Sequence, residues 1–128
     1  MAEFSNYLEN KVLDHVLRNT SYNSPTTVYV GLYTSDPTDA GSGTEVSGGS
    51  YARQVLSVTT ASAGIVTSSA DINFPQATAS WGSVGYLGIL DALSSGNLLM
   101  HTALTTAKTI DTGDILKISS GNLTVTLD

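Results

Sequence analysis

The chain has 128 residues, of which only 12% are charged, and its formal net charge is −6. Its five Lys and Arg residues are scattered, which argues against a nucleic-acid partner because phosphate binding depends on clustered positive charge. Cysteine is absent, so disulfides and thiolate metal sites are excluded. The first residues lack the pattern of a signal peptide and no apolar run reaches membrane-spanning length, so no membrane partner is expected. The length suits a single domain over residues 1–128.

The first element that the sequence predicts is a helix over about residues 5–19. Apolar residues recur every four positions at Phe4, Leu8 and Val12, which is the spacing of one helix face. Ser5 is a suitable N-cap. Two roles are open for this helix: it covers one face or open end of a sheet, or it docks on a neighbouring subunit through Phe4, Leu8 and Val12.

Residues 27–34 predict a central strand with both faces occupied. Val30 and Leu32 fall on one face, and Tyr29 and Tyr33 fall on the other, because side chains alternate across a strand.

The next segment, residues 35–50, is predicted to be an exposed loop because it holds almost no core-forming residue and contains Asp-Pro and Gly-Gly pairs. Such a long excursion is uncommon unless it binds something, so contact with another subunit is favoured. Arg53 follows the loop and can pair with one of its acidic residues within or between protomers. The acidic spacing does not match an EF-hand, so no metal site is expected. The candidate contact residues here are Asp36, Asp39, Glu45, Val46, Tyr51 and Arg53.

The rest of the chain alternates short extended runs with turn residues. Gly85 and Gly88 are suited to a bulge or to a close backbone approach. Trp81 is either a core residue or an anchor in a subunit interface. The pattern predicts a mainly β fold, a single-domain antiparallel β-sandwich or barrel-like fold with one N-terminal α-helix. The predicted strands cover residues 51–60, 65–68, 71–74, 84–90, 98–104, 115–118 and 123–127, and the runs 84–90 and 98–104 form a hairpin.

The sequence contains no set of residues that is suited to catalysis. His15 follows Asp14 directly on the predicted helix, where neighbouring side chains diverge by about 100°, and His101 lies in a predicted strand. No nucleophile elbow, phosphate loop or metalloprotease motif is present. The expectation is therefore a protein that is not an enzyme and has no cofactor.

Several stretches of the first half resemble a known family. These are residues 6–10 (NYLEN), residues 13–17 (LDHVL) and residues 28–54 (VYVGLYTSDPTDAGSGTEVSGGSYARQ). They are similar to small virion proteins of tailed bacteriophages, which are often labelled tail fibre proteins and some of which resemble head decoration (cement) proteins. The resemblance implies a virion protein that is assembled in the host cytoplasm and has the major capsid protein or other virion proteins as partners.

Three functions remain open at this point. The first is a head decoration protein that binds the capsid lattice and stabilises it, because the chain is too short for a fibre shaft. It would act as a symmetric homo-oligomer, with a trimer favoured, and many weak apolar contacts would add up through avidity. The second is a small tail fibre, adaptor or baseplate component. The third is a glycan-binding module with an exposed aromatic platform, for which Trp81, Tyr22 and Tyr51 are the candidates.

Overall fold

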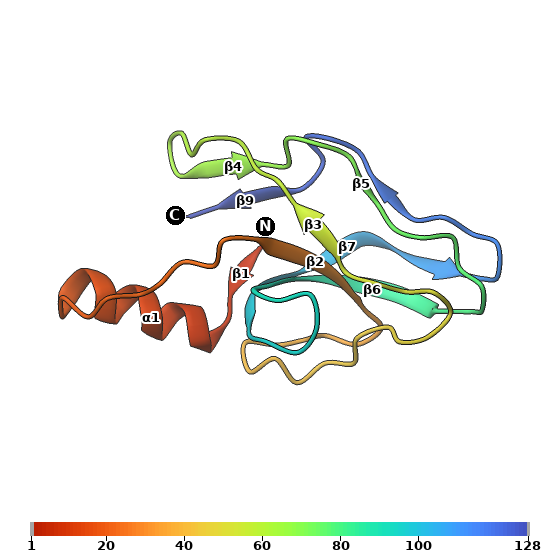
Figure 1. Ribbon diagram of the computed structural model, residues 1–128, viewed down its shortest axis with the longest axis horizontal. Helices are drawn as coiled ribbons and strands as arrows, with labels where there is room; N and C mark the ends of the chain where they lie inside the picture. Colours follow the sequence, from red (N-terminus) through yellow and green to blue (C-terminus); the bar gives the residue numbers. More distant parts are fainter. Residues whose placement is uncertain (1, 128) are drawn as a thin grey trace.

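The computed structural model describes residues 2–127, and within them the chain forms one helix and nine strands (Figure 1). The main element is a five-stranded sheet with the order β1-β7-β6-β2-β3, whose strand pairs are antiparallel. Two two-stranded ribbons, β4-β9 and β5-β8, complete the β structure. The elements are β1 (Glu3–Phe4), α1 (Asn6–Leu17), β2 (Val28–Tyr33), β3 (Gln54–Leu56), β4 (Ile65–Thr67), β5 (Ile72–Asn73), β6 (Gly82–Leu90), β7 (Leu98–Ile110), β8 (Lys117–Ile118) and β9 (Thr124–Thr126).

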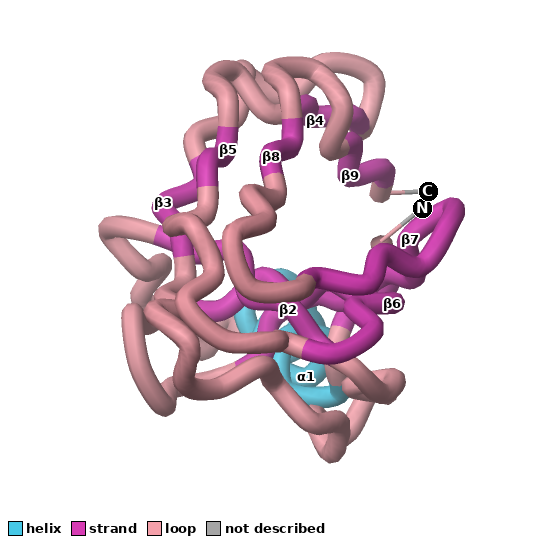
Figure 2. The backbone as a smooth tube through the Cα atoms, turned by 90° about the vertical axis from the view of Figure 1, so that its right-hand side faces the viewer, coloured by secondary structure: helices cyan, strands magenta, loops and turns pink. Residues whose placement is uncertain are grey.

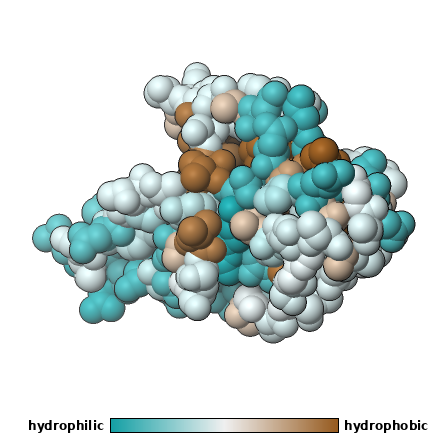
Figure 3. All heavy atoms as spheres, turned by 45° about the vertical axis from the view of Figure 1, so that its right-hand side comes forward, coloured by the Kyte–Doolittle hydropathy of each residue, from teal (hydrophilic) through white to brown (hydrophobic). Residues whose placement is uncertain are grey.

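The β structure has two layers. Figure 2 shows the ribbons β4-β9 and β5-β8 above one face of the main sheet, while α1 lies on the opposite side of the sheet. The predicted mainly β fold with one N-terminal helix is thus confirmed, and the sheet is open at β1 and β3 and does not close into a barrel. On the face drawn in Figure 3, the visible hydrophobic side chains gather beneath the ribbon layer, and most of the remaining surface is polar.

The two faces of β2 carry different sets of core residues, as its alternation predicts. Val30 and Leu32 are fully buried in the main core between the sheet and the ribbons. Tyr33 instead joins a small cluster with Leu90 and Leu98 on the α1 side of the sheet. The central position of β2, between β6 and β3, explains why both faces are covered.

The hairpin of β6 and β7 is confirmed, and β7 is longer than the sequence predicts. It continues from Leu98 to Ile110, and its register against β6 shifts between Val84 and Tyr86. Gly85 lies at this shift, which agrees with the bulge expected there. After Leu104 most residues of β7 are exposed and do not alternate between apolar and polar. The sequence therefore does not predict this second part of the strand.

The predicted helix is confirmed as α1, with termini that follow the usual rules. The Ser5 hydroxyl accepts a hydrogen bond from the Leu8 amide at 3.2 Å, which is the N-cap interaction. At the other end the Asp14 carbonyl accepts from Arg18 and Thr20, each at 3.1 Å. Asn19 between them has a φ of 56°, so the helix ends in a left-handed residue. No helix among residues 2–127 is long and apolar enough to cross a membrane.

Strand β1 is the one element that the sequence does not predict. It consists of Glu3–Phe4 and pairs with β7, where Glu3 lies opposite His101 and Phe4 opposite Met100. The sequence predicts Phe4 on the apolar face of the helix, and the structure shows it in β1, one residue before the N-cap Ser5.

We expect the free energy of unfolding to fall by about 2–5 kcal/mol in the variant Leu32→Ala, because Leu32 is fully buried at the centre of the sheet and the substitution leaves a cavity. The matched control is Leu93→Ala, where the same atoms are removed from a side chain that is 58% exposed, and the expected change is within about 0.5 kcal/mol. Urea denaturation of both variants measures the difference. Equal losses would contradict the assignment of the core.

Candidate functional site

The loop that follows β2, over residues 34–46, is held in place by an ion pair between Glu45 and Arg53. The side of the protein that carries this loop is called the loop side below. The two carboxylate oxygens of Glu45 accept from Arg53 Nε and Nη2, each at 2.8 Å, so the pair is bidentate. Arg53 Nη1 also donates to the carbonyls of Ala92 and Ser95 at 2.8 Å. The guanidinium side chain is only 9% exposed. Arg53 therefore joins the 34–46 loop to the turn between β6 and β7 within one chain.

Tyr51 extends this network into the sheet. Its hydroxyl donates to Glu45 Oε2 at 2.6 Å and accepts from the Leu32 amide at 2.9 Å. Burial, together with the hydrogen bond to Glu45, raises the pKa of Tyr51, and the hydrogen bond to Glu45 also raises the pKa of Arg53. The raised pKa values keep Tyr51 a neutral phenol that can donate to Glu45 and keep Arg53 a charged guanidinium.

Gly31 provides the space that this network occupies. A Cβ atom at this position would lie 2.9 Å from Glu45 Oε2 and 3.2 Å from the Tyr51 hydroxyl. A side chain on β2 would therefore push the carboxylate away from its partners.

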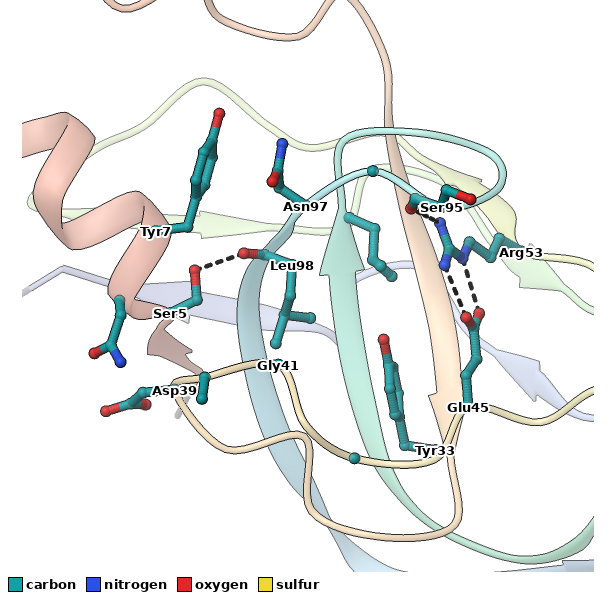
Figure 4. Close-up of a pocket in the computed structure, with 15 residues that line it drawn as sticks. Ser5, Tyr7, Tyr33, Asp39, Gly41, Glu45, Arg53, Ser95, Asn97 and Leu98 are labelled. Atoms are coloured by element: carbon teal, nitrogen blue, oxygen red, sulfur yellow. Dashed lines mark hydrogen bonds and ion pairs between the residues drawn. The ribbon is translucent and has the colours of Figure 1, made fainter.

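A cavity of about 580 Å³ lies between the start of α1, the loop and the end of the β6–β7 turn. Figure 4 shows Tyr33 standing in it, with the Glu45–Arg53 pair on one side and the hydrogen bond from Ser5 Oγ to the Leu98 carbonyl on the other. Burial raises the pKa of Tyr33. The Ser5 hydroxyl and the Glu45–Arg53 pair, which border the cavity, are bonded to other protein atoms.

A second cluster surrounds His101 on the same side of the sheet. His101 is 7% exposed, and its Nε2 lies 2.8 Å from Asp39 Oδ1. Its Nδ1 lies 3.9 Å from Asp36 Oδ1. One carboxylate oxygen of Glu3 lies within 4.8 Å of the ligand atoms of both His101 and Asp39. The sequence gives no sign of this grouping, because Asp39 and His101 are 62 positions apart.

The third feature is the apolar stripe of α1, which is covered at one end and bare at the other. Leu8 is buried against the sheet and Val12 is half-buried. Leu13, Val16 and Leu17 are 55%, 68% and 74% exposed. Figure 1 shows that α1 starts beside β1 and projects away from the sheet, so its last turns lie beyond the sheet, and the segment between α1 and β2 runs back alongside the helix.

The structure places the predicted contact residues in two groups. Leu8, Val46 and Trp81 are buried within the single chain, where their side chains pack inside the protein, and their expected role in an interface stays a prediction. Phe4, Val12 and Tyr51 are half-buried, Glu45 and Arg53 pair with each other, and Asp36 and Asp39 face His101.

The expected glycan platform does not form as the sequence suggests. Trp81 is 4% exposed and lies edge-on to Tyr51, with ring centroids 5.5 Å apart. The Tyr51 ring also stacks on Phe74 at 6.2 Å. Trp81 Nε1 donates to the Gly49 carbonyl at 2.9 Å. Trp81 is therefore a core residue that holds the loop, which is one of the two roles open from the sequence, and Tyr22 is half-buried.

Comparison with known protein families gives a match over nearly the whole chain. A protein-family model described as "Podophage GP4 fiber I protein gp80" matches residues 3–126 of the chain. No curated protein matches the sequence.

We expect Glu45→Ala to lower the free energy of unfolding by about 3–5 kcal/mol, because it leaves the Arg53 guanidinium buried without a counter-charge. The double variant Glu45→Ala/Arg53→Met should regain part of this loss, since it removes both charges. Asp71→Ala is the control: it breaks an ion pair with Lys117 whose side chains are about half exposed, and its effect should be far smaller. Chemical denaturation of the three proteins measures this, and equal effects of Glu45→Ala and Asp71→Ala would refute it.

Proposed function

The chain belongs to the podophage GP4 fiber I protein gp80 family and is therefore a structural protein of the phage virion that associates with other virion proteins. From this premise we propose that it is a small tail fibre component without enzymatic activity, which attaches to another virion protein through the exposed half of α1.

The exposed end of the α1 stripe is the observation that carries this proposal. Leu13, Val16 and Leu17 lie at i, i+3 and i+4, so they form one continuous face. An apolar helix face in water is unfavourable unless a partner covers it, and laying such a face into a groove is a common mode of protein recognition. The charges along the helix alternate in sign, with Glu9, Lys11 and others, so no strong repulsion opposes its approach to another protein.

The absence of catalysis in this proposal is supported by the state of the polar groups. The carboxylate of Glu45 is held by Arg53 and Tyr51. The ring of His101 faces two carboxylates, those of Asp39 and Asp36. These groups stabilise the arrangement of the loop, and the proposed function needs no further role for them.

A second candidate is a decoration protein on the head. It is favoured by the shape of the described residues, which form a layered body with one projecting helix and no elongated shaft. Such a protein would act through many copies, as a symmetric oligomer such as a trimer.

The two positions are separated by where the protein lies on the particle. Labelled antibodies against the chain should bind at the tail of intact virions. Quantitative mass spectrometry should find only a few copies of the chain in each particle. Labelling over the whole head, with copies in proportion to the capsid lattice, would reject the tail position and establish decoration.

The attachment surface is tested by the triple variant Leu13→Ser/Val16→Ser/Leu17→Ser. We expect its body to unfold at nearly the same denaturant concentration as the unmodified protein, because all three side chains are exposed. Its incorporation into particles should be lost, because the apolar contact is removed. The matched control is Leu93→Ser/Ile115→Ser, which alters exposed apolar residues elsewhere and should incorporate normally. Immunoblots of purified particles give the result, and normal incorporation of the triple variant would refute attachment through α1.

A further inference from the structure

The side chains of Glu3, Asp39 and His101 converge on the α1 side of the sheet. One ligand atom of each lies within 4.8 Å of the other two, and Asp39 Oδ1 is 2.8 Å from His101 Nε2. We propose that these three residues bind one divalent transition-metal ion, with Zn²⁺ as the best match. This proposal is independent of where the protein sits on the virion.

The geometry fits a single ion after small side-chain movements. Ligands on one Zn²⁺ lie about 2.0–2.2 Å from the metal, so neighbouring ligands are about 3.0–3.5 Å apart. Asp39 Oδ1 and His101 Nε2 now form a hydrogen bond at 2.8 Å, so they would have to move slightly apart to bind one ion. Glu3 and Asp39 are exposed, so their carboxylates are free to rotate toward an ion, whereas the imidazole is buried and fixed.

The backbone brings the three ligands together from separate segments. Glu3 on β1 and His101 on β7 are directly paired residues, so their side chains project from the same face of the sheet. Asp39 reaches the site from the 34–46 loop, and its carbonyl accepts a hydrogen bond from the Asn6 amide at 2.9 Å. The main chain thus positions all three ligands without help from an ion.

Asp36 places a second carboxylate near the histidine, although its Oδ1 accepts a hydrogen bond from the Thr38 amide at 2.9 Å and is too far from the ring for a hydrogen bond. Its Oδ1 lies 3.9 Å from Nδ1, the ring nitrogen that faces away from Asp39. A carboxylate hydrogen-bonded to the second nitrogen of an imidazole makes the first nitrogen a better metal ligand, and Asp36 would have to approach Nδ1 to act in this way. The sequence predicts no metal site among the acidic residues of this loop, and the structure places Asp36 near an imidazole.

Charge also favours a cation at this point. Glu3, Asp36 and Asp39 place three carboxylates around His101, and within residues 2–127 the ion pairs of Asp36 and Asp39 are made with His101 alone. The ion pairs of Arg53 and Lys117 are made with other carboxylates, those of Glu45 and Asp71, and not with the carboxylates around His101. A divalent ion would offset the repulsion among these carboxylates.

The donor set selects the kind of metal. An imidazole nitrogen with carboxylate oxygens suits Zn²⁺ and similar transition ions, whereas Ca²⁺ and Mg²⁺ prefer oxygen ligands alone. Water would complete the coordination. The bound ion would tie β1, β7 and the loop together at the base of α1, because Ser5 and Asn6 follow Glu3 after a single residue.

The test uses the untagged full chain, stripped with EDTA and titrated calorimetrically with Zn²⁺ and with Ca²⁺. We expect one Zn²⁺ for each chain, no measurable binding of Ca²⁺, and a rise in Tm that EDTA reverses, because a ligand of the folded state stabilises it. Absence of Zn²⁺ binding to the unmodified chain would overturn the proposal.

Variants assign the binding to these residues. Loss of an outer partner of a metal ligand lowers affinity by about 10–100-fold, so Asp39→Asn and His101→Gln, which remove ligands, should lower it at least as much. Glu3→Gln and Asp39→Asn change exposed side chains, so they keep the test valid if His101→Gln does not fold. His15→Gln alters the other histidine of the chain, which is exposed on α1, and should bind Zn²⁺ as before. Unchanged affinity in Asp39→Asn and Glu3→Gln, or loss in His15→Gln, would refute the site.

Discussion

The ion pair of Glu45 and Arg53 is the interaction on which the loop side of the molecule depends. A buried pair of charges is stable only when hydrogen bonds replace the water that both groups lose. Arg53 makes four such bonds, to Glu45 and to the carbonyls of Ala92 and Ser95, and Glu45 accepts a further one from Tyr51. The loop after β2 and the turn before β7 are therefore fixed by one side chain, although neither segment has regular structure of its own.

The two faces of the sheet are held together in different ways. The ribbon side is held by apolar burial, with Val30, Leu32 and Val84 fully excluded from water. On the α1 side a glycine, Gly31, gives room to the carboxylate and the phenol, and polar contacts hold the loop in place. One face therefore supplies the cooperative stability of the fold, and the other supplies a shaped polar surface around the base of α1.

Much of the fold, but little of the site, could be predicted from the sequence. Alternation in residues 27–34 and the Ser5 cap are local signals, and both led to correct elements. The pairing of β1 with β7, and the meeting of Asp39 with His101, depend on register and on chain path over tens of residues. The exposed loop was expected to reach outward through Val46, but that side chain enters the core, because a long loop can fold back on its own domain.

The free energy that α1 could contribute to binding indicates how it would act in assembly. Full burial of a Val or Leu side chain contributes about 1.5–3 kcal/mol, so Leu13, Val16 and Leu17 together supply at most about 9 kcal/mol. Association costs about 4–15 kcal/mol in lost freedom of motion, so a single helix of this size gives a weak contact. Several copies bound to one assembly share that cost, and the effective concentration of the remaining helices rises once the first is bound. A short apolar stripe thus suits a protein of which even a few copies bind one assembly, because attachment becomes firm once neighbouring copies are in place.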